Sequence, residues 1–315
     1  MRGDYMSSEP CDSPISILDF SEHRKTAMVY AARLWPGIYM GANDIHQAAV
    51  PEAVSEEYHC IKLNYCLNGR CELELSNGRY VYMSRGLLSL ESNQTQGGYR
   101  FPTQTYQGLE IILDLNTVED ETLRMLMDFG IDTEMIQKGL READGSLISG
   151  TTEEWDRIAE ETFRLLVGQN TEQAEVRILF IRLLYMLTHR HRRVLPEKTF
   201  LTSGQRRIAM DAQRLLTENI SRHVRIEDLA KASCVSASSL KSYFAQLYGA
   251  PISEYMKNLR MQTAEKQILE TDASIGEIAS AVGYLNQSKF GAAFKEYSGL
   301  SPLEYRRMNK GRNEV

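Results

Sequence analysis

The sequence predicts an α+β multidomain protein, with a β-barrel near the N-terminus, a helical segment after it and an all-α domain at the C-terminus. Three observations lead to this fold class. Apolar and polar residues alternate with period two in the first third of the chain, helical periodicity begins at about residue 117, and one helical pattern occurs twice near the C-terminus. The 315 residues are enough for two domains of roughly 150 residues each.

The barrel is predicted over residues 26–116, after an irregular polar segment at 1–25. Residues 57–67 are rich in β-forming side chains, and the stretch that follows alternates between apolar and acidic residues. Asn68 and Gly69 separate the two stretches, and this dipeptide is a strong hairpin signal. The two strands are therefore expected to pair with each other.

Residues 117–194 are predicted to form a helical dimerisation segment. The stretch at 171–191 contains no Gly or Pro, and its apolar stripe is wide enough to pack against its own domain and also against a partner helix. A linker is expected at 195–204, before a separate all-helical domain at 205–310. The side chains expected at the dimer interface are Phe180, Leu183, Leu184 and Leu187.

The helical pattern near the C-terminus occurs twice. Ile226 and Ile275 begin the two copies and are 49 positions apart, whereas Phe244 and Phe294 are 50 positions apart. The second copy therefore has a turn that is one residue longer. Two short helices with a tight turn are typical of a helix-turn-helix, whose second helix enters the DNA major groove. A solenoid would need at least three copies.

Charge is unevenly distributed along the chain, whose net charge is −6. Residues 203–315 contain 16 Lys and Arg against 12 Asp and Glu, whereas residues 1–202 contain 20 against 30. A basic C-terminal part on an acidic chain fits a DNA-binding domain joined to a domain of another kind.

The sequence indicates a cytoplasmic protein with reduced thiols. Its N-terminus lacks the apolar segment of a secretory signal, and no apolar run reaches the roughly 18 residues that cross a bilayer. The five cysteines form no CxxC pair. A hairpin at Asn68 and Gly69 would bring Cys66 and Cys71 together, but buried apolar filling is favoured over a redox or metal pair.

Each copy also contains particular residues that match a known pattern. In the first copy these are Ile226, Leu229, Ala230, Ser236, Leu240, Phe244, Gly249, Pro251, Tyr255 and Arg260. In the second copy they are Ile275, Ile278, Ala279, Val282, Gly283, Tyr284, Phe290, Phe294, Lys295, Gly299, Ser301, Pro302, Tyr305 and Arg306. With these residues, positions 206–308 resemble the DNA-binding domain of AraC/XylS-type transcription regulators. The resemblance implies two helix-turn-helix units joined by a long helix, here residues 252–269, and a separate cupin-like N-terminal domain that binds an effector and forms dimers.

The first turn departs from the family pattern, which usually has glycine where this chain has Cys234. If the position needs a positive φ, a residue with a side chain is mildly strained there. The first unit is therefore expected to sit slightly differently from the second. Cys234 is interpreted as a small buried filler rather than a redox sensor.

The second helix of each unit is expected to contact DNA with its outward face, at sites about 34 Å apart. Gln can bond adenine and Lys can reach guanine, but neither helix has an outward Arg at the reading positions, so shape and phosphate contacts should matter more than usual. The predicted base-reading residues are Ser238, Lys241, Ser242, Asn286, Gln287, Ser288, Lys289 and Ala292. The predicted phosphate contacts are Arg260, Lys295, Arg306 and Arg307.

The barrel is expected to bind a small organic effector, since a small barrel can enclose one ligand and tyrosines are concentrated in this part of the chain. For each tyrosine, a role in the core or on the surface is the alternative. The candidate effector-binding residues are Tyr30, Arg33, Tyr58, Lys62, Asn64, Tyr99, Arg100 and Tyr106.

No sequence motif indicates an enzyme, a metal site or a cofactor. The chain contains no phosphate-binding loop, no HExxH and no GxSxG. His59 and Cys60 are adjacent on a predicted strand and would point to opposite faces. The barrel region has only His46 and His59, too few for a cupin-type metal enzyme.

The sequence therefore predicts a ligand-responsive, dimeric, sequence-specific DNA-binding transcription regulator, an activator by analogy with the family. Its expected partners are double-stranded DNA, a small organic effector, a second copy of the chain and RNA polymerase. The alternative is a small-molecule or partner-binding barrel protein with a degenerate DNA-binding domain, which the outward alanines and serines favour slightly. A barrel enzyme is the third interpretation.

Overall fold

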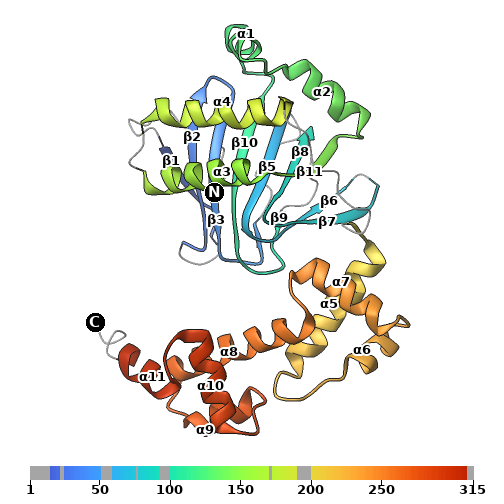
Figure 1. The fold of residues 1–315 in the computed structure, drawn as a ribbon, viewed down its shortest axis with the longest axis vertical. Helices are drawn as coiled ribbons and strands as arrows, with labels where there is room; N and C mark the ends of the chain where they lie inside the picture. The colour runs from blue at the N-terminus through green and yellow to red at the C-terminus, as the bar shows by residue number, and fades with distance from the viewer. Residues whose placement is uncertain are drawn as a thin grey trace. The chain divides into compact units, whose positions relative to one another are not determined.

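The chain forms two compact units, Met1–Thr202 and Ser203–Val315. In Figure 1 the first unit consists of strands with helices packed on them, and the second consists of helices. The predicted combination of an antiparallel β-rich N-terminal part and an all-helical C-terminal part is confirmed. The computed structural model describes residues 15–21, 25–50, 59–75, 77–92, 99–169, 172–189 and 200–310.

The first unit contains two antiparallel sheets. The larger has seven strands in the order β1 (Ile15–Asp19), β2 (Ala27–Trp35), β3 (Ile38–Ile45), β10 (Tyr106–Asp114), β5 (Cys60–Gly69), β8 (Leu87–Ser92) and β11 (Ser146–Gly150). The smaller has five in the order β12 (Phe200–Thr202), β7 (Arg79–Met83), β6 (Cys71–Glu74), β9 (Tyr99–Arg100) and β4 (Ala49–Val50).

Two apolar layers cover opposite faces of the larger sheet, because successive side chains of a strand point to opposite faces. In β5, Leu63 belongs to one layer and Cys66 to the other. The layer around Cys66 also contains Val81 of the smaller sheet, so it fills the space between the two sheets. The layer around Leu63 lies under the helices α1 (Asp120–Asp128), α2 (Thr133–Glu142), α3 (Glu153–Gly168) and α4 (Gln173–His189).

The predicted hairpin at Asn68 and Gly69 is wrong. β5 pairs with β8 and β10 in the larger sheet, whereas β6 pairs with β7 and β9 in the smaller. The chain changes sheets here, and Gly69 has a φ of 78°. A Cβ on Gly69 would lie 1.9 Å from the carbonyl oxygen of Thr105, so the close approach of two backbones requires glycine. A second Asn-Gly dipeptide, Asn77 and Gly78, lies in the turn that joins β6 to β7.

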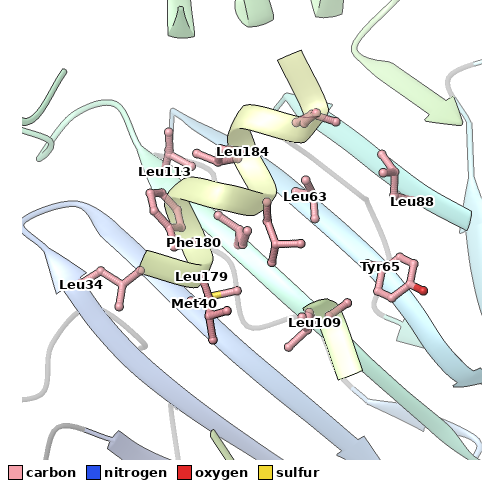
Figure 2. Packing of buried hydrophobic residues seen from close by; sticks show 14 of the residues in the cluster. Leu34, Met40, Leu63, Tyr65, Leu88, Leu109, Leu113, Leu179, Phe180 and Leu184 are labelled. Carbon is pink, nitrogen blue, oxygen red and sulfur yellow. The ribbon is translucent and has the colours of Figure 1, made fainter. Parts of the chain in front are cut away.

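The apolar stripe of α4 is buried inside the first unit. In Figure 2, Phe180 and Leu184 lie over the strands of the larger sheet. Arg177 also fixes the helix, because its Nε donates a 2.8 Å hydrogen bond to the carbonyl oxygen of Leu34 in β2. The predicted dimer contacts are therefore corrected: side chains packed in their own core cannot cover a partner. The four residues are Phe180, Leu183, Leu184 and Leu187, which are 0%, 1%, 2% and 4% exposed.

The segment predicted to be helical also contains a strand that its periodicity does not indicate. This strand, β11, is only five residues long and pairs with β8 at the edge of the larger sheet. Of the predicted linker, residues 195–199 lie outside the described residues. Its remaining residues are in regular structure, since β12 pairs with β7 and α5 begins at Ser203.

The described part of the second unit, residues 203–310, contains seven helices: α5 (Ser203–Glu218), α6 (Ile226–Ala232), α7 (Ala237–Tyr248), α8 (Ile252–Glu270), α9 (Ile275–Ala281), α10 (Gln287–Ser298) and α11 (Pro302–Lys310). The predicted long helix corresponds to α8. This helix closes the first set of helices, α5 to α8, and opens the second, α8 to α11. In the described part of the chain, no helix is long and apolar enough to cross a membrane.

The sequence repeat is also a repeat of packing. Phe244 on α7 and Phe294 on α10 are both fully buried. The ring of Phe244 meets that of Tyr255 edge-on at 5.2 Å and 82°, and Phe294 meets Tyr305 in the same way at 5.5 Å and 81°. Phe244 and Phe294 therefore hold equivalent positions in the cores of the two helix-turn-helix units.

Candidate nucleic-acid interface

The C-terminal unit contains two helix-turn-helix units, whose second helices are α7 and α10. Each of these helices follows a tight turn and is capped at both ends. Ser236 caps α7 and Asn286 caps α10, each by accepting a 3.0 Å hydrogen bond from the backbone N–H three residues later. Gly249 and Gly299 end the two helices, each with a φ of 79°. Both helices are 12 residues long, so the two units present matching elements.

Most side chains predicted to contact DNA are exposed on or beside these helices. Lys241 on α7 and Gln287 and Lys289 on α10 have no hydrogen-bond or ion-pair partner among the described residues, so their polar groups are available to bases. The exposed predicted residues are Ser238, Lys241, Ser242, Asn286, Gln287, Ser288, Lys289, Ala292, Lys295 and Arg307.

Some of these polar groups already have partners. The side-chain oxygen of Asn286 caps α10. In α7, the Ser238 Oγ lies 2.9 Å from that of Ser236, and the Ser242 Oγ accepts a 3.1 Å hydrogen bond from Gln246 Nε2. The first helix-turn-helix unit therefore offers fewer uncommitted polar groups than the second helix-turn-helix unit.

Arg260 and Arg306 are corrected from phosphate contacts to structural residues. Arg260 donates from Nε and Nη2 to two carbonyl oxygen atoms that follow α5. Arg306 donates in the same manner to two carbonyl oxygen atoms at and after the end of α8. The four bonds are 2.7–3.2 Å long. Three of the acceptors lie in the connections between helices, and the fourth, Ile268, lies in the last turn of α8.

One exposed residue beside α10 is missing from the predictions. Leu285, in the turn before the helix, is 107% exposed. Apolar side chains can read the methyl group of thymine, so Leu285 is a further candidate for base contact. The sequence signal for it is an apolar residue that does not fit the helical periodicity of its neighbours.

The two turns differ at one position. Cys234 has a φ of 53° in the first turn and Gly283 has a φ of 84° in the second. Cys234 therefore adopts the left-handed conformation in which a side chain is strained. Its thiol is exposed, which corrects the prediction of a buried filler, because the turn directs this side chain away from the core.

A second candidate site lies between the two sheets of the N-terminal unit, Met1–Thr202. Lys62 on β5 forms an ion pair with Glu110 on β10 and a hydrogen bond with the hydroxyl of Tyr99 on β9. The side chains of the pair are only 15% and 10% exposed. Burial alone would lower the pKa of Lys62, but the charges of Glu110 and Glu91 raise it above its usual value.

We call the buried polar side chains around Lys62 and Glu110 the interior cluster. Two more predicted effector residues, Asn64 and Tyr106, belong to it. The Tyr106 hydroxyl donates a 2.6 Å hydrogen bond to Asn64 Oδ1, and its ring stacks on Phe101 at 5.1 Å. The predictions missed Glu91, which accepts a 2.7 Å hydrogen bond from Ser89. The alternation of polar and apolar residues in β8 is the signal that could have placed Ser89 and Glu91 on this face.

The remaining predicted effector residues lie elsewhere. Tyr30 packs against the layer under the helices, because it occupies the opposite face of the larger sheet, and this corrects its expected role. Arg33 and Arg100 are exposed. Tyr58 lies outside the described residues.

Cys66 and Cys71 are free thiols buried in the same layer as the interior cluster. Burial raises the pKa of Cys66 to about 12 and that of Cys71 well above its usual value. Both thiols are therefore protonated at neutral pH and weakly nucleophilic. The described residues contain no group of three His, Cys, Asp or Glu side chains placed to hold a metal ion.

Comparison with known proteins identifies the kind of domain that the C-terminal unit forms. The sequence profile of a helix-turn-helix domain matches residues 229–308. A putative AraC-like transcription regulator of Streptomyces lividans is 32% identical over 100 residues, which are 32% of this chain and 33% of that protein. The C-terminal unit, Ser203–Val315, is an AraC-type helix-turn-helix domain.

A second relative and a solved structure also match part of the chain. An uncharacterized HTH-type transcriptional regulator of Bacillus subtilis, YisR, is 27% identical over 150 residues, 46% of this chain and 50% of its own length. The matches thus span between a third and a half of these two relatives. A solved transcriptional regulator of Chromobacterium violaceum, with an AraC-type DNA-binding domain, is 26% identical, covers 34% of this chain and 96% of its own, and gives a TM-score of 0.32.

Proposed function

We propose that the chain is a ligand-responsive, sequence-specific DNA-binding transcription regulator that activates transcription through contact with RNA polymerase. One observation carries the proposal. The AraC-type domain builds the same helix-turn-helix packing twice around α8, and each copy exposes uncommitted polar side chains on its second helix. The activating role follows the analogy with the family.

In this proposal α10 reads most of the base sequence. Gln287 can bond adenine through both groups of its amide, Lys289 can reach guanine, and Leu285 can contact a thymine methyl. On α7, Lys241 is the main reader, since the serines are partly engaged. Lys295 and Arg307 contact phosphates as exposed cations.

The interior cluster of the N-terminal unit is proposed to bind the effector. A buried ion pair such as Lys62 with Glu110 seldom stabilises a protein as well as apolar residues of the same size. Its position between two apolar sheets therefore supports a binding role. The stacked rings of Phe101 and Tyr106 suit an organic molecule that has an aromatic or other apolar part.

Dimerisation is proposed to use the outer face of α4 rather than its buried stripe. Ile178 and Tyr185 are 68% and 44% exposed and lie seven positions apart, on one side of the helix, with half-buried Ile181 between them. Ile178→Glu combined with Tyr185→Glu should give a monomer in sedimentation measurements, whereas Lys138→Glu on α2 should not. An unchanged molecular mass for the double variant would contradict this placement.

The DNA-binding part is tested by selection of duplexes from a random library with the full-length chain, followed by footprinting. We expect one enriched sequence with two contacted segments, and an affinity that falls steeply between low and physiological salt. Lys289→Ala should weaken binding, whereas Lys138→Ala should leave it unchanged. Absence of any enriched sequence would contradict the proposal.

The effector part is tested with a library of small organic molecules and the thermal unfolding of the full-length chain. A ligand should raise the unfolding temperature of the wild type. The double variant Lys62→Met with Glu110→Gln removes both charges together, so that neither is left buried alone, and should abolish the shift. A shift that persists in the double variant would place the ligand elsewhere.

A further inference from the structure

The geometry points to Arg260 as the positioning residue that joins the two helix-turn-helix units and so fixes the spacing at which α7 and α10 read DNA. The inference rests on the proposed DNA-binding function and adds a residue that acts without touching DNA.

The guanidinium of Arg260 holds the first unit to the middle of α8. Its Nε donates a 3.0 Å hydrogen bond to the carbonyl oxygen of Ile220, and its Nη2 donates a 3.0 Å hydrogen bond to that of Arg222. Both acceptors lie in the connection between α5 and α6. This connection sets the position of α6, against which α7 packs.

The same guanidinium lies against the turn of the second unit. A Cβ on Gly283 would be 3.1 Å from Nη2 of Arg260 and 3.0 Å from the carbonyl oxygen atoms of both Ile220 and Ser221. The turn before α10 therefore touches the connection before α6. Three segments that are distant in sequence meet at one side chain, and two of them lead directly into the two units.

A second link between the two units is weaker than that of Arg260. Lys257 on α8 forms a 2.8 Å ion pair with Glu296 on α10, but both side chains are exposed, and exposed ion pairs contribute little. A planar guanidinium can bond two carbonyl groups at fixed angles, whereas a lysine ammonium cannot reproduce that geometry. Arg260 is thus the side chain best suited to hold the two turns at a constant separation.

A fixed separation has a measurable effect on DNA recognition. One inserted base pair moves the second segment by about 3.4 Å and turns it by about 35° around the DNA axis, because a helical turn contains 10–10.5 base pairs in 34–36 Å. A rigid pair of reading helices cannot follow this change. A pair joined only by α8 can follow it in part.

The test uses the full-length chain and the duplex selected by the wild type, with zero, one or two base pairs inserted between the two footprinted segments. For the wild type we expect one inserted base pair to weaken binding about 100-fold, equivalent to two contacts of the size of a mismatched base pair. For Arg260→Ala and Arg260→Lys we expect the loss on insertion to shrink to about tenfold or less, and binding to the uninterrupted site to weaken about tenfold.

Two matched controls separate positioning from other roles. Arg306→Ala removes the same kind of paired bond, but to Ile268 and Ala273, so it should lower stability without changing the insertion penalty. Arg307→Ala removes an exposed cation, so it should reduce the slope of log K against log salt by about one while the penalty stays the same.

Several results would overturn the inference. An unchanged insertion penalty in both Arg260 variants would do so, and a reduced salt slope would then identify a phosphate contact instead. A full penalty in Arg260→Lys alone would show that a charge suffices. If Arg260→Ala does not fold, the lysine variant, which retains the apolar stem, decides the question. Failure of the wild type to select any duplex would instead contradict the proposed function itself.

Discussion

The two helix-turn-helix units have reading helices of the same length but different supporting helices. In the second unit, α9 begins with a capping box: Ser274 Oγ accepts from the Glu277 N–H at 3.2 Å, and Glu277 accepts from the Ser274 N–H at 2.8 Å. In the first unit, Arg225 occupies the N-cap position before α6, and its side chain does not cap the helix. The turn residues differ as well, since Gly283 adopts a positive φ freely and Cys234 does so under strain.

This difference places local stabilisation mainly in the second unit. The second unit also has the uncommitted amide of Gln287, whereas the serines of α7 partly bond to neighbours. We infer that the second unit sets the register on DNA and that the first adjusts to it. The predictions below test this division, from the largest expected effect to the smallest.

The cores of the two units should be equally important. Phe294→Ala and Phe244→Ala should each lower the free energy of unfolding by about 3–5 kcal/mol, because each empties a fully buried site of similar packing. Denaturant unfolding monitored by circular dichroism measures both losses. Losses that differ by more than about 2 kcal/mol would show that the cores are not equivalent.

The turns should respond unequally. Gly283→Ala should lower the free energy of unfolding by about 2 kcal/mol or more, since it adds strain at positive φ and a Cβ close to the carbonyl oxygen of Ile220. Cys234→Ala should change stability by less than about 0.5 kcal/mol, because a side chain already stands exposed at that position. Thermal unfolding of the two variants gives the comparison. Equal effects would mean that the two turns are under the same constraint.

The reading helices should also differ. Gln287→Ala should cost about 1–3 kcal/mol of binding free energy and relax base preference at one position. The equivalent position in the first unit is Ala237, so this change makes the second helix resemble the first. Competition binding against all single-base variants of the selected duplex measures the effect. Ser238→Ala is the control and should change affinity by less than about 0.5 kcal/mol.

A cap can be added to the first unit. Arg225 corresponds to Ser274, and Asp228 corresponds to Glu277, so Arg225→Ser would create a cap like that of α9. We expect it to raise the free energy of unfolding by about 1 kcal/mol. Arg225→Ala, which removes the same side chain without adding an acceptor, should not stabilise. Chemical denaturation of both variants distinguishes a cap from the loss of a charge.

The smallest effect concerns pH. Hydrogen bonds from Ser274 lower the pKa of Glu277 below its usual value of 4.5. A group with a lowered pKa in the folded state stabilises above its unfolded pKa, and this contribution is lost as pH falls through the folded pKa. Glu277→Gln should therefore reduce the drop in unfolding temperature between neutral and acidic buffer. An unchanged drop would show that the capping box is not maintained in solution.

Local patterns in the sequence predicted what depends on local spacing. The repeat, the length of α8 and the inward position of Phe244 and Phe294 all follow from helical periodicity. The roles of Arg260 and Arg306 could not be predicted in this way. Their partners are carbonyl groups 33 to 40 residues earlier in the chain, and no periodicity indicates such pairs.

Two incorrect predictions in the N-terminal unit, Met1–Thr202, have a similar origin. Asn68 and Gly69 carry a hairpin signal, but β5 pairs in the larger sheet and β6 in the smaller, and no local pattern indicates these distant partners. The stripe around Phe180 is apolar enough for either a core or an interface, and only the position of the larger sheet decides between them. The interior cluster was predicted in part, because Lys62 and Asn64 share one face of a strand by simple alternation.

The position of α8 in both sets of helices limits how the domain can be divided. Tyr255 packs in the first set, and Met261, Ala264 and Ile268 pack in the second. A fragment that ends before α8 lacks the last helix of the first set, and a fragment that begins after it lacks the first helix of the second. Expression of one reading helix with its complete support therefore requires α8, which also carries residues that pack in the other set.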